Sequence, residues 1–392
     1  MSKKISEISL KTMFECENYS CQCVKDIINV ALDEAPKVTL KLYSDMSRPL
    51  LFSYVAKAGL TMTGKAGGVI EGNILSKLLS IPNGDVDKHV DFFEKYGFLF
   101  PLPSNEYTSI DADALMEIVN RIKATIRLYN AINKKNYKGI LVNVVYLLYS
   151  PIIQIELSDF IFSTCHHEFS KLLESYNLFP DLNTVPEVFA KGTYSVEDTF
   201  LSRNNHVDID FYNKVRSGAN TTLQGSNDSR FKNLMAMYIG CRDANNETRT
   251  LIDFFYHFQT EVSVFKEVRF GRIIPYTHID ESAFSIEIKN SLLKVAKIVV
   301  AEEINHNIRG IHPRYNGGKL TASWQVDNLI EALYFSIFYM NTGEIYKECE
   351  NPNCKHDRFF LVEATRSNKH YCCEKCRNAA SAQRHRNRKL SK

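Results

Sequence analysis

The chain has 392 residues, which at about 100–200 residues per domain is enough for two or three domains. Hydrophobic residues make up 44% and charged residues 24% of the sequence, and these values exclude a disordered, collagen-like or fibrous protein. With 48 Lys and Arg against 45 Asp and Glu, the net charge is only +3. Taken over the whole chain, this small charge predicts no strong attraction to nucleic acid or to an acidic membrane.

The sequence carries no sign of secretion or of membrane insertion. Its first residues are polar and lack an apolar core of ~7–15 residues, so we expect no secretory signal. The most apolar stretch, Ile140–Ile153, is shorter than the ~20 residues of a membrane helix and is predicted to be a buried core element. We therefore expect a soluble, cytoplasmic protein with no membrane partner, whose ten cysteines are reduced thiols.

Helical periodicity dominates most of the chain, because apolar residues recur three or four positions apart in many segments. In chain order, helices are predicted over Val24–Leu32, Val69–Leu79, Val86–Phe93, Asp113–Ile132, Phe231–Cys241, Leu251–Val264, Ile286–Ile304 and Val326–Met340. Strand-like segments are few and short: Val38–Tyr43, Ile152–Leu157 and Ile273–Tyr276. The predicted fold class is therefore mainly α with minor β.

Two polar stretches and one shift in composition suggest the domain organisation. Residues 217–229 are rich in turn-forming residues and predict a boundary between a mainly helical N-terminal body, 1–216, and a second helical segment, 230–345. Pro313–Ala322 is predicted to be a shorter break inside that segment. Cysteines and arginines concentrate near the C-terminus, so residues 346–392 are predicted to form a separate small domain.

The most informative feature is the cysteine cluster in this C-terminal domain. Cys349 and Cys354 form one pair, and after a gap of seventeen residues Cys372, Cys373 and Cys376 supply another. Tetrahedral zinc takes four soft ligands, which two closely spaced pairs can provide from two turns. Spacing alone allows either Cys372 or Cys373 in the ligand set. We expect one structural Zn²⁺, whose binding supplies the folding free energy of this small module.

The segment between the two cysteine pairs predicts the rest of the module. Residues 358–362 have β character and would form half of a small hairpin. His356 and His370 are alternative ligands by their chemistry, but four thiols make them unnecessary. The module is thus predicted to be a zinc-stabilised β-hairpin followed by a helix.

This C-terminal segment also resembles a known family. The residues that carry the resemblance are the four cysteines Cys349, Cys354, Cys372 and Cys376 together with Phe359, Phe360, Thr365, Tyr371, Arg377 and Asn378. They are similar to the CGNR-type zinc finger, which ends bacterial proteins described as stress-induced transcription regulators. The resemblance covers only about the last 45 residues and implies that Cys372, not Cys373, is the third ligand. Ala379 replaces the family's glycine, and the arginine that follows it is also absent.

A basic helix follows the last cysteine. Its positive residues, together with two short polar ones, are the candidate nucleic-acid contacts: Arg377, Asn378, Ser381, Arg384, Arg386, Arg388 and Lys389. The helix has no aromatic residues for base stacking, which argues against an RNA reader, and the choice of DNA follows from the family resemblance. The other interpretation is a solvated terminal tail, which is common for terminal charge runs.

The distribution of charge supports a nucleic-acid partner more than its total does. Residues 347–392 contain 12 Lys and Arg against 5 Asp and Glu, a net charge of +7. The rest of the chain has 36 against 40, a net charge of −4. The near-neutral total therefore combines a mildly acidic body with a basic end.

Several other motifs are weaker, and we interpret them as structural. Cys165-His166-His167 contains a nucleophile and a base, but near neighbours in sequence seldom face each other, and no orienting acid is apparent. Glu303-x2-His306 matches half of a di-iron carboxylate pattern and is predicted to lie on a solvated helix face. Cys16, Cys21 and Cys23 supply only three thiols and are predicted to lie at the edge of a helix.

The sequence as a whole predicts a DNA-binding, transcription-regulator-like protein. The zinc is expected to be structural, because four thiolates leave no open position for catalysis. The body would sense a signal, form a homo-oligomer or bind a protein partner. Two alternatives remain: the zinc module docks a protein, or the body is an enzyme with a tethered module.

Overall fold

The computed structural model describes most of the chain. The described residues are 12–16, 18–28, 37–55, 58–64, 68–104, 106–157, 160–175, 245–257, 265–275, 279–316, 321–340, 344–354, 358–363 and 368–390. The predicted boundary at 217–229 and the predicted helix Phe231–Cys241 lie outside these residues.

The chain divides into two compact units, each assembled from separate stretches. The first contains Met1–Lys123, Ile153–Thr164 and Ile304–Lys392, and the second contains Ala124–Ile152 and Cys165–Glu303. Two of the four boundaries on the sequence fall inside long helices, α3 (Ala112–Lys134) and α10 (Ile286–Ile308). The predicted domains 1–216, 230–345 and 346–392 remain predictions.

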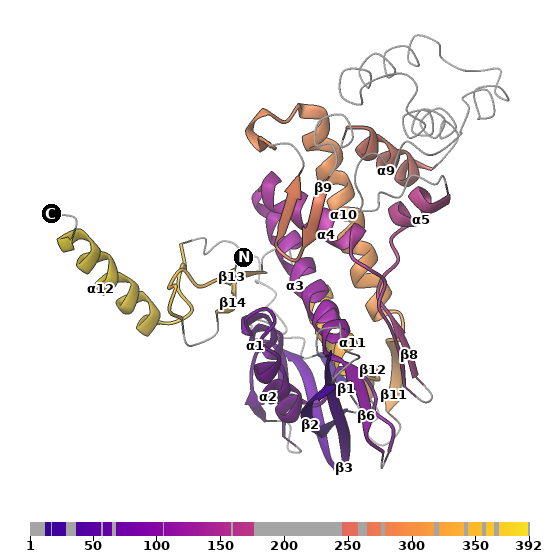
Figure 1. Ribbon diagram of the computed structural model, residues 1–392. Helices are drawn as coiled ribbons and strands as arrows, with labels where there is room; N and C mark the ends of the chain where they lie inside the picture. The colour runs from indigo at the N-terminus through magenta and orange to yellow at the C-terminus, as the bar shows by residue number, and fades with distance from the viewer. Residues whose placement is uncertain are drawn as a thin grey trace, which may run out of the picture. The chain divides into compact units, whose positions relative to one another are not determined.

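The first unit is built on a curled, largely antiparallel sheet of eight strands (Figure 1). Its strands are β1 (Thr12–Cys16), β2 (Asn18–Ile28), β3 (Lys37–Val55), β4 (Gly59–Thr63), β5 (Val69–Glu71), β6 (Thr108–Asp111), β11 (His312–Asn316) and β12 (Thr321–Val326). Strand β3 is antiparallel to its partners β1, β2, β4 and β6, whereas β1 and β12 pair in parallel. The prediction of a mainly α fold with minor β is therefore wrong.

The largest error concerns the segment predicted as a helix over Val24–Leu32, whose described part is the end of β2. Cys21 and Cys23 are buried, whereas Gln22 and Val24 are exposed, which is the period of two of a strand with one buried face. Strand β2 pairs along its whole length with β3. Pairing with a distant partner decides the conformation here, and a helical period in so short a segment cannot reveal it.

The helix predicted over Val69–Leu79 is also wrong in part, because this segment contains a short strand followed by a helix. Residues 69–71 form β5, and α1 (Ile74–Ser80) begins only after Asn73. The Asn73 backbone is left-handed with φ 55°, and its side chain accepts a hydrogen bond from Ser76 N. This Asn cap ends the extended segment and starts the helix.

The remaining helices of the first unit follow the predicted periodicity. Helix α2 (Val86–Tyr96) is capped by Asp85, whose side chain accepts from Lys88 N, and α11 (Leu329–Phe338) is capped in the same way by Asn328. Helix α2 lies against β2 (Figure 1), where Cys21 Sγ donates to Phe93 O at 3.1 Å. These helices, together with α3 and α10, confirm the corresponding sequence predictions.

The second unit is mainly helical. The elements that lie wholly within it are α4 (Tyr137–Tyr149), α5 (Glu168–Ser175), α9 (Asn246–His257), the hairpin β9 (Phe265–Arg269) and β10 (Arg272–Pro275), and a short 3₁₀ helix, Glu281–Ala283. The apolar run Ile140–Ile153 is largely α4, which is buried as predicted. Among the described residues, no helix combines the length and the apolar character needed to cross a membrane.

The predicted strands are confirmed, but one predicted loop is not. Val38–Tyr43 lies in β3, Ile152–Leu157 contains β7 (Gln154–Leu157), and Ile273–Tyr276 overlaps β10. Strand β7 forms a hairpin with β8 (Phe160–Ser163). Pro313–Ala322, predicted to be a break, instead contains most of β11 and the start of β12, which pair in register.

The close approach of α2 to β2 depends on Gly97. This residue has φ +80°, and a Cβ there would lie 2.5 Å from Tyr19 O. Gly97→Ala should lower the free energy of unfolding by about 1–2 kcal/mol for the left-handed backbone and by a further ~1–3 kcal/mol for the clash. Gly84→Ala is the matched control, because Gly84 has φ +73° with nothing within 4 Å of its Cβ position. Equal losses in thermal unfolding would contradict this prediction.

Candidate metal centre

The C-terminal module of the first unit is a two-stranded hairpin followed by a helix. Strands β13 (Glu344–Glu348) and β14 (Phe359–Glu363) pair antiparallel, and α12 (Glu374–Leu390) follows. The predicted hairpin-and-helix architecture of this module is therefore present.

Local backbone geometry places the first cysteine pair. Cys349 follows the end of β13 and donates its N–H to Arg358 O at 2.6 Å. Asn351 forms the turn that follows, since its side chain accepts from Asn353 N at 3.2 Å and its carbonyl accepts from Cys354 N at 3.0 Å. The turn brings Cys354 back toward Cys349, as Asn and Pro in this gap favour.

The second pair lies where the chain enters α12. Cys372 precedes the helix and Cys376 lies in its first turn, so the two thiols reach the cluster from one helix N-terminus. The positive end of the helix dipole favours thiolates at this place.

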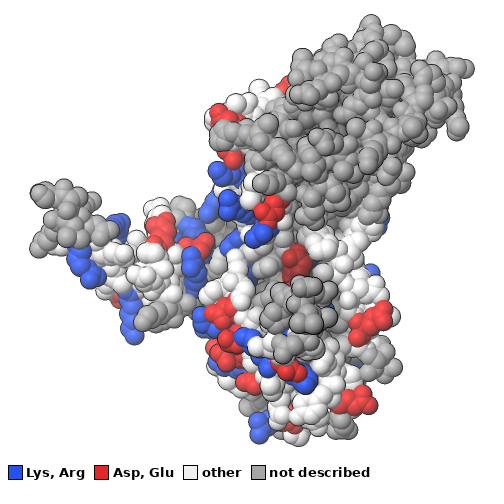
Figure 2. Space-filling view, viewed as in Figure 1, with Lys and Arg blue, Asp and Glu red and all other residues white. Residues whose placement is uncertain are grey.

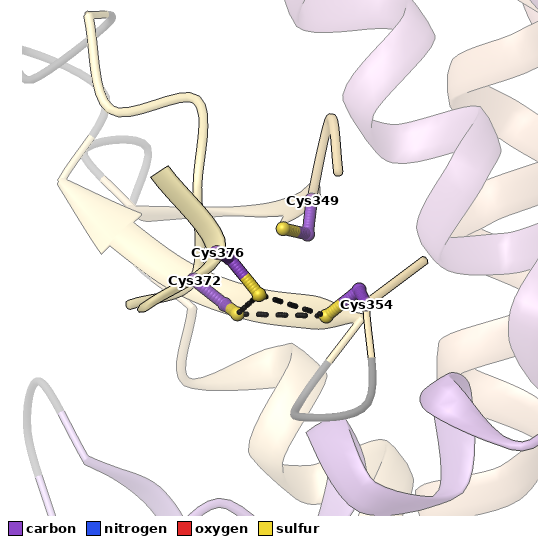
Figure 3. Close-up of side chains that lie close together, drawn as sticks. All are labelled: Cys349, Cys354, Cys372 and Cys376. Atoms are coloured by element: carbon purple, nitrogen blue, oxygen red, sulfur yellow. Dashed lines mark hydrogen bonds between the residues drawn. The ribbon is translucent and has the colours of Figure 1, made fainter. Parts of the chain in front are cut away.

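The four thiols of Cys349, Cys354, Cys372 and Cys376 converge and could hold a metal ion. All four sulfurs lie within 4.8 Å of one another. Three of the pairwise sulfur distances are 3.5–3.6 Å, and Figure 3 shows the Cys349 sulfur facing the other three. Four sulfurs at 2.3 Å around one zinc would be separated by about 3.8 Å. The cluster therefore has nearly the dimensions of a tetrahedral thiolate site.

The fifth cysteine of the module, Cys373, stands apart from this set. Its sulfur lies 3.8 Å from that of Cys372, but it does not share the mutual spacing of the other four. The geometry thus groups Cys372 with the other ligand candidates, which is the choice that the family resemblance implies.

The electrostatics of the cluster favour a cation. Burial and the neighbouring thiols Cys376 and Cys354 raise the pKa of Cys372 above its ordinary value. Without a cation, four thiolates at this spacing would repel one another. A divalent ion supplies the positive charge that allows all four thiols to ionise.

The described part of the module has only a small apolar core around these cysteines. Its buried cluster consists of Ile345, Phe360 and Val362 with Cys349 and Cys376. So few apolar side chains cannot offset the conformational entropy lost on folding. Metal binding is the interaction that could offset it.

The module is joined to the rest of the first unit through α1. Ser76 Oγ donates to Phe359 O, and Phe359 N donates to Ser80 Oγ at 3.0 Å. Tyr346 OH donates to Asn73 Oδ1 at 2.8 Å, beside the cap of the same helix. Helix α1 thus anchors both strands of the hairpin.

Helix α12 presents one buried face and a broad polar surface. Cys376 and Ala380 are buried and Gln383 is half-buried, so the helix packs on the module along this stripe. The predicted nucleic-acid contacts Arg377, Asn378, Ser381, Arg384 and Arg386 are all exposed. Arg388 and Lys389 lie on the helix, but their side chains are outside the description. Figure 2 shows Lys and Arg side chains along this part of the molecule.

The three cysteines near the N-terminus, Cys16, Cys21 and Cys23, lie in strands. Cys21 and Cys23 are buried in β2, and Cys16 is buried in β1, so the prediction of a helix edge is wrong. Burial and the neighbouring Glu94 raise the pKa of Cys23 to about 12. These thiols are therefore inert rather than nucleophilic.

The predictions for Cys165-His166-His167 and Glu303-x2-His306 are wrong in part. Glu303, expected on a solvated face, is 1% exposed, and it lies with Cys165 and His167 in a second cluster of potential metal ligands. A sequence signal for this was present, because Glu303 continues the buried stripe of Val295 and Val299 at a spacing of four. His306 does not complete a di-iron pattern; its Nε2 lies 2.7 Å from Ser163 O.

Comparison with known proteins adds no family assignment. No protein-family model matches the chain, and no significant match was found among curated proteins or solved structures.

The ligand set predicts the metal content of single variants. Cys349→Ser should lose the ion of this site, because serine oxygen is a poor substitute for thiolate in a soft tetrahedral set. Cys373→Ser is the matched control within the same module and should retain the ion. Metal analysis of the folded, reduced proteins distinguishes them, and a metal content equal to that of the wild type in the Cys349 variant would refute the proposed ligands.

Proposed function

We propose that the C-terminal module binds one structural Zn²⁺ and presents α12 to nucleic acid, most simply double-stranded DNA. Four thiolates make a closed coordination shell, which is the usual form of a structural zinc site and leaves no position for substrate. The observation that carries the proposal is the arrangement of exposed arginines on α12 around a face that is packed on the cysteine cluster.

The helical positions fit a groove. Successive residues are rotated by about 100° around the helix axis, so Arg377 and Arg384 lie on one flank and Arg386 on the other. Asn378 and Ser381 lie between the two flanks, on the side away from buried Cys376. In the major groove, the arginines would meet phosphates on both walls and the short polar side chains would meet base edges.

Charge supports the same assignment. No acidic residue follows Glu374 in the chain, so the exposed surface of α12 after its first turn is wholly neutral or basic. Arg377 donates to Glu374 Oε1 at 2.7 Å, but this exposed pair is worth little and can exchange for a phosphate. Zn²⁺ with four thiolates contributes about −2, so the net charge of +7 in residues 347–392 becomes about +5, and this positive charge would lie beside the DNA backbone.

The body would hold this helix in place. The hydrogen bonds from α1 to both hairpin strands give the module a fixed attachment instead of a free linker. The resemblance of the C-terminal segment to zinc fingers of transcription regulators agrees with such a role. Reduced cysteines require a reducing compartment, so the proposal places the protein in the cytoplasm.

The salt dependence of DNA binding tests the proposal. Arg384→Gln and Arg386→Gln should each weaken binding uniformly across sequences and reduce the slope of log K against log salt by about 0.9, the value for one phosphate contact. Arg48→Gln is the control, since it removes the same charge from an exposed residue of β3. Fluorescence anisotropy with duplex DNA at several salt concentrations gives the slopes.

Base recognition has a separate signature. Asn378→Ala should alter the preference among DNA sequences while the slope stays unchanged, because it removes no charge. If full-length protein shows no salt-dependent binding to DNA, or if Arg48→Gln changes the slope as much as the two α12 variants, the proposed function is wrong. Retention of an acidic protein partner by α12 in place of DNA would favour a protein-docking module.

A further inference from the structure

A second cluster of potential metal ligands lies in the second unit, independent of the cysteine module. One donor atom from each of Cys165, His167 and Glu303 lies within 4.8 Å of the other two. His167 Nε2 is 2.9 Å from Glu303 Oε1, and His167 Nδ1 is 3.9 Å from Cys165 Sγ. His167 and Glu303 are each 1% exposed, and Cys165 is 7% exposed.

The local backbone explains why these residues converge. Residues 164–167 are irregular and lead from β8 into α5, and Cys165 and His167 are both buried whereas His166, between them, is half-buried. Alternate residues of a non-helical segment can share one side, so the pair faces the same partners. Those partners are carboxylates near the end of α10, where Glu303 lies on the buried stripe.

Glu302 holds the histidine ring from the other side. Its Oε2 lies 2.5 Å from His167 Nδ1, and its Oε1 accepts the N–H of Glu168 at 3.2 Å. Metal-binding histidines commonly donate their second ring nitrogen to a carboxylate, which fixes the ring and its tautomer. Glu302 stands in this relation to His167 Nδ1, while His167 Nε2 faces the Glu303 carboxylate.

We propose that Cys165 Sγ, the His167 imidazole and the Glu303 carboxylate bind a divalent transition-metal ion, with Glu302 as the positioning residue for the His167 ring. Thiolate and imidazole ligands favour zinc-like ions over Mg²⁺ or Ca²⁺, which prefer all-oxygen sites. Three protein ligands of mixed S, N and O type form an incomplete tetrahedron, unlike the closed set of four thiols.

A purely structural ion pair is the rival explanation. It accounts for His167 between two carboxylates, but not for a cysteine thiol brought to the same imidazole. The convergence of three ligand types is what a metal site requires.

Metal stoichiometry tests the proposal on the full-length protein. Reduced protein loaded with Zn²⁺ should carry two ions per chain by native mass spectrometry, one in each cluster. A single ion that disappears in Cys349→Ser would overturn this inference and leave the cysteine module intact. Two ions in the wild type, with one remaining in Cys349→Ser, is the expected result.

Conservative variants localise the second ion. Glu303→Gln and Cys165→Ser should each bind one Zn²⁺ instead of two, whereas His166→Gln, next to both ligands in sequence, should keep two. Retention of two ions in both ligand variants would refute the site.

Because a buried variant can fail to fold, the wild type is also filled first with one Zn²⁺ and then with one Co²⁺. The expected cobalt spectrum has a thiolate charge-transfer band weaker than that of a four-thiolate site, and absence of this band overturns the proposal.

Discussion

The arrangement of the C-terminal end depends on one interaction, the convergence of four cysteine sulfurs. Three of their separations are 3.5–3.6 Å, which is too close for four ionised thiols to coexist without a cation between them. The hairpin strands and the first turn of α12 meet at this point, where Ile345, Phe360 and Val362 add a small apolar cluster. The direction of α12 is therefore tied to the geometry of the thiols, with Ala380 packed beside them.

That constraint links metal binding to the exposed surface of α12. Cys376 and Ala380 hold one side of the helix against the module, so the arginines are left on the two flanks and the short polar residues between them. Hydrogen bonds of Ser76, Ser80 and Tyr346 attach the hairpin to α1, and so to the rest of the first unit. Helix α1 also packs against β4 and α11.

Particular elements show which parts of the fold local sequence patterns can predict. Helices α2, α3, α10 and α11 were predictable because their apolar residues recur at helical spacing and polar residues lie at their starts. Strand β2 was not, since its pairing with β3 and its contact with α2 outweigh a short apparent helical period. Cys165 and Glu303 are more than a hundred residues apart, and no local spacing could bring them together.

The sequence by itself determined the cysteine module: its ligand spacing, its hairpin and helix, and the basic character of residues 347–392. These are local properties, since a metal site built from two short turns requires only nearby residues. Tertiary structure alone decided the eight-stranded sheet and the cluster around His167. Both depend on contacts between segments that are distant in the sequence. Strand pairing and burial stabilise these contacts, and local sequence patterns do not predict which segments meet.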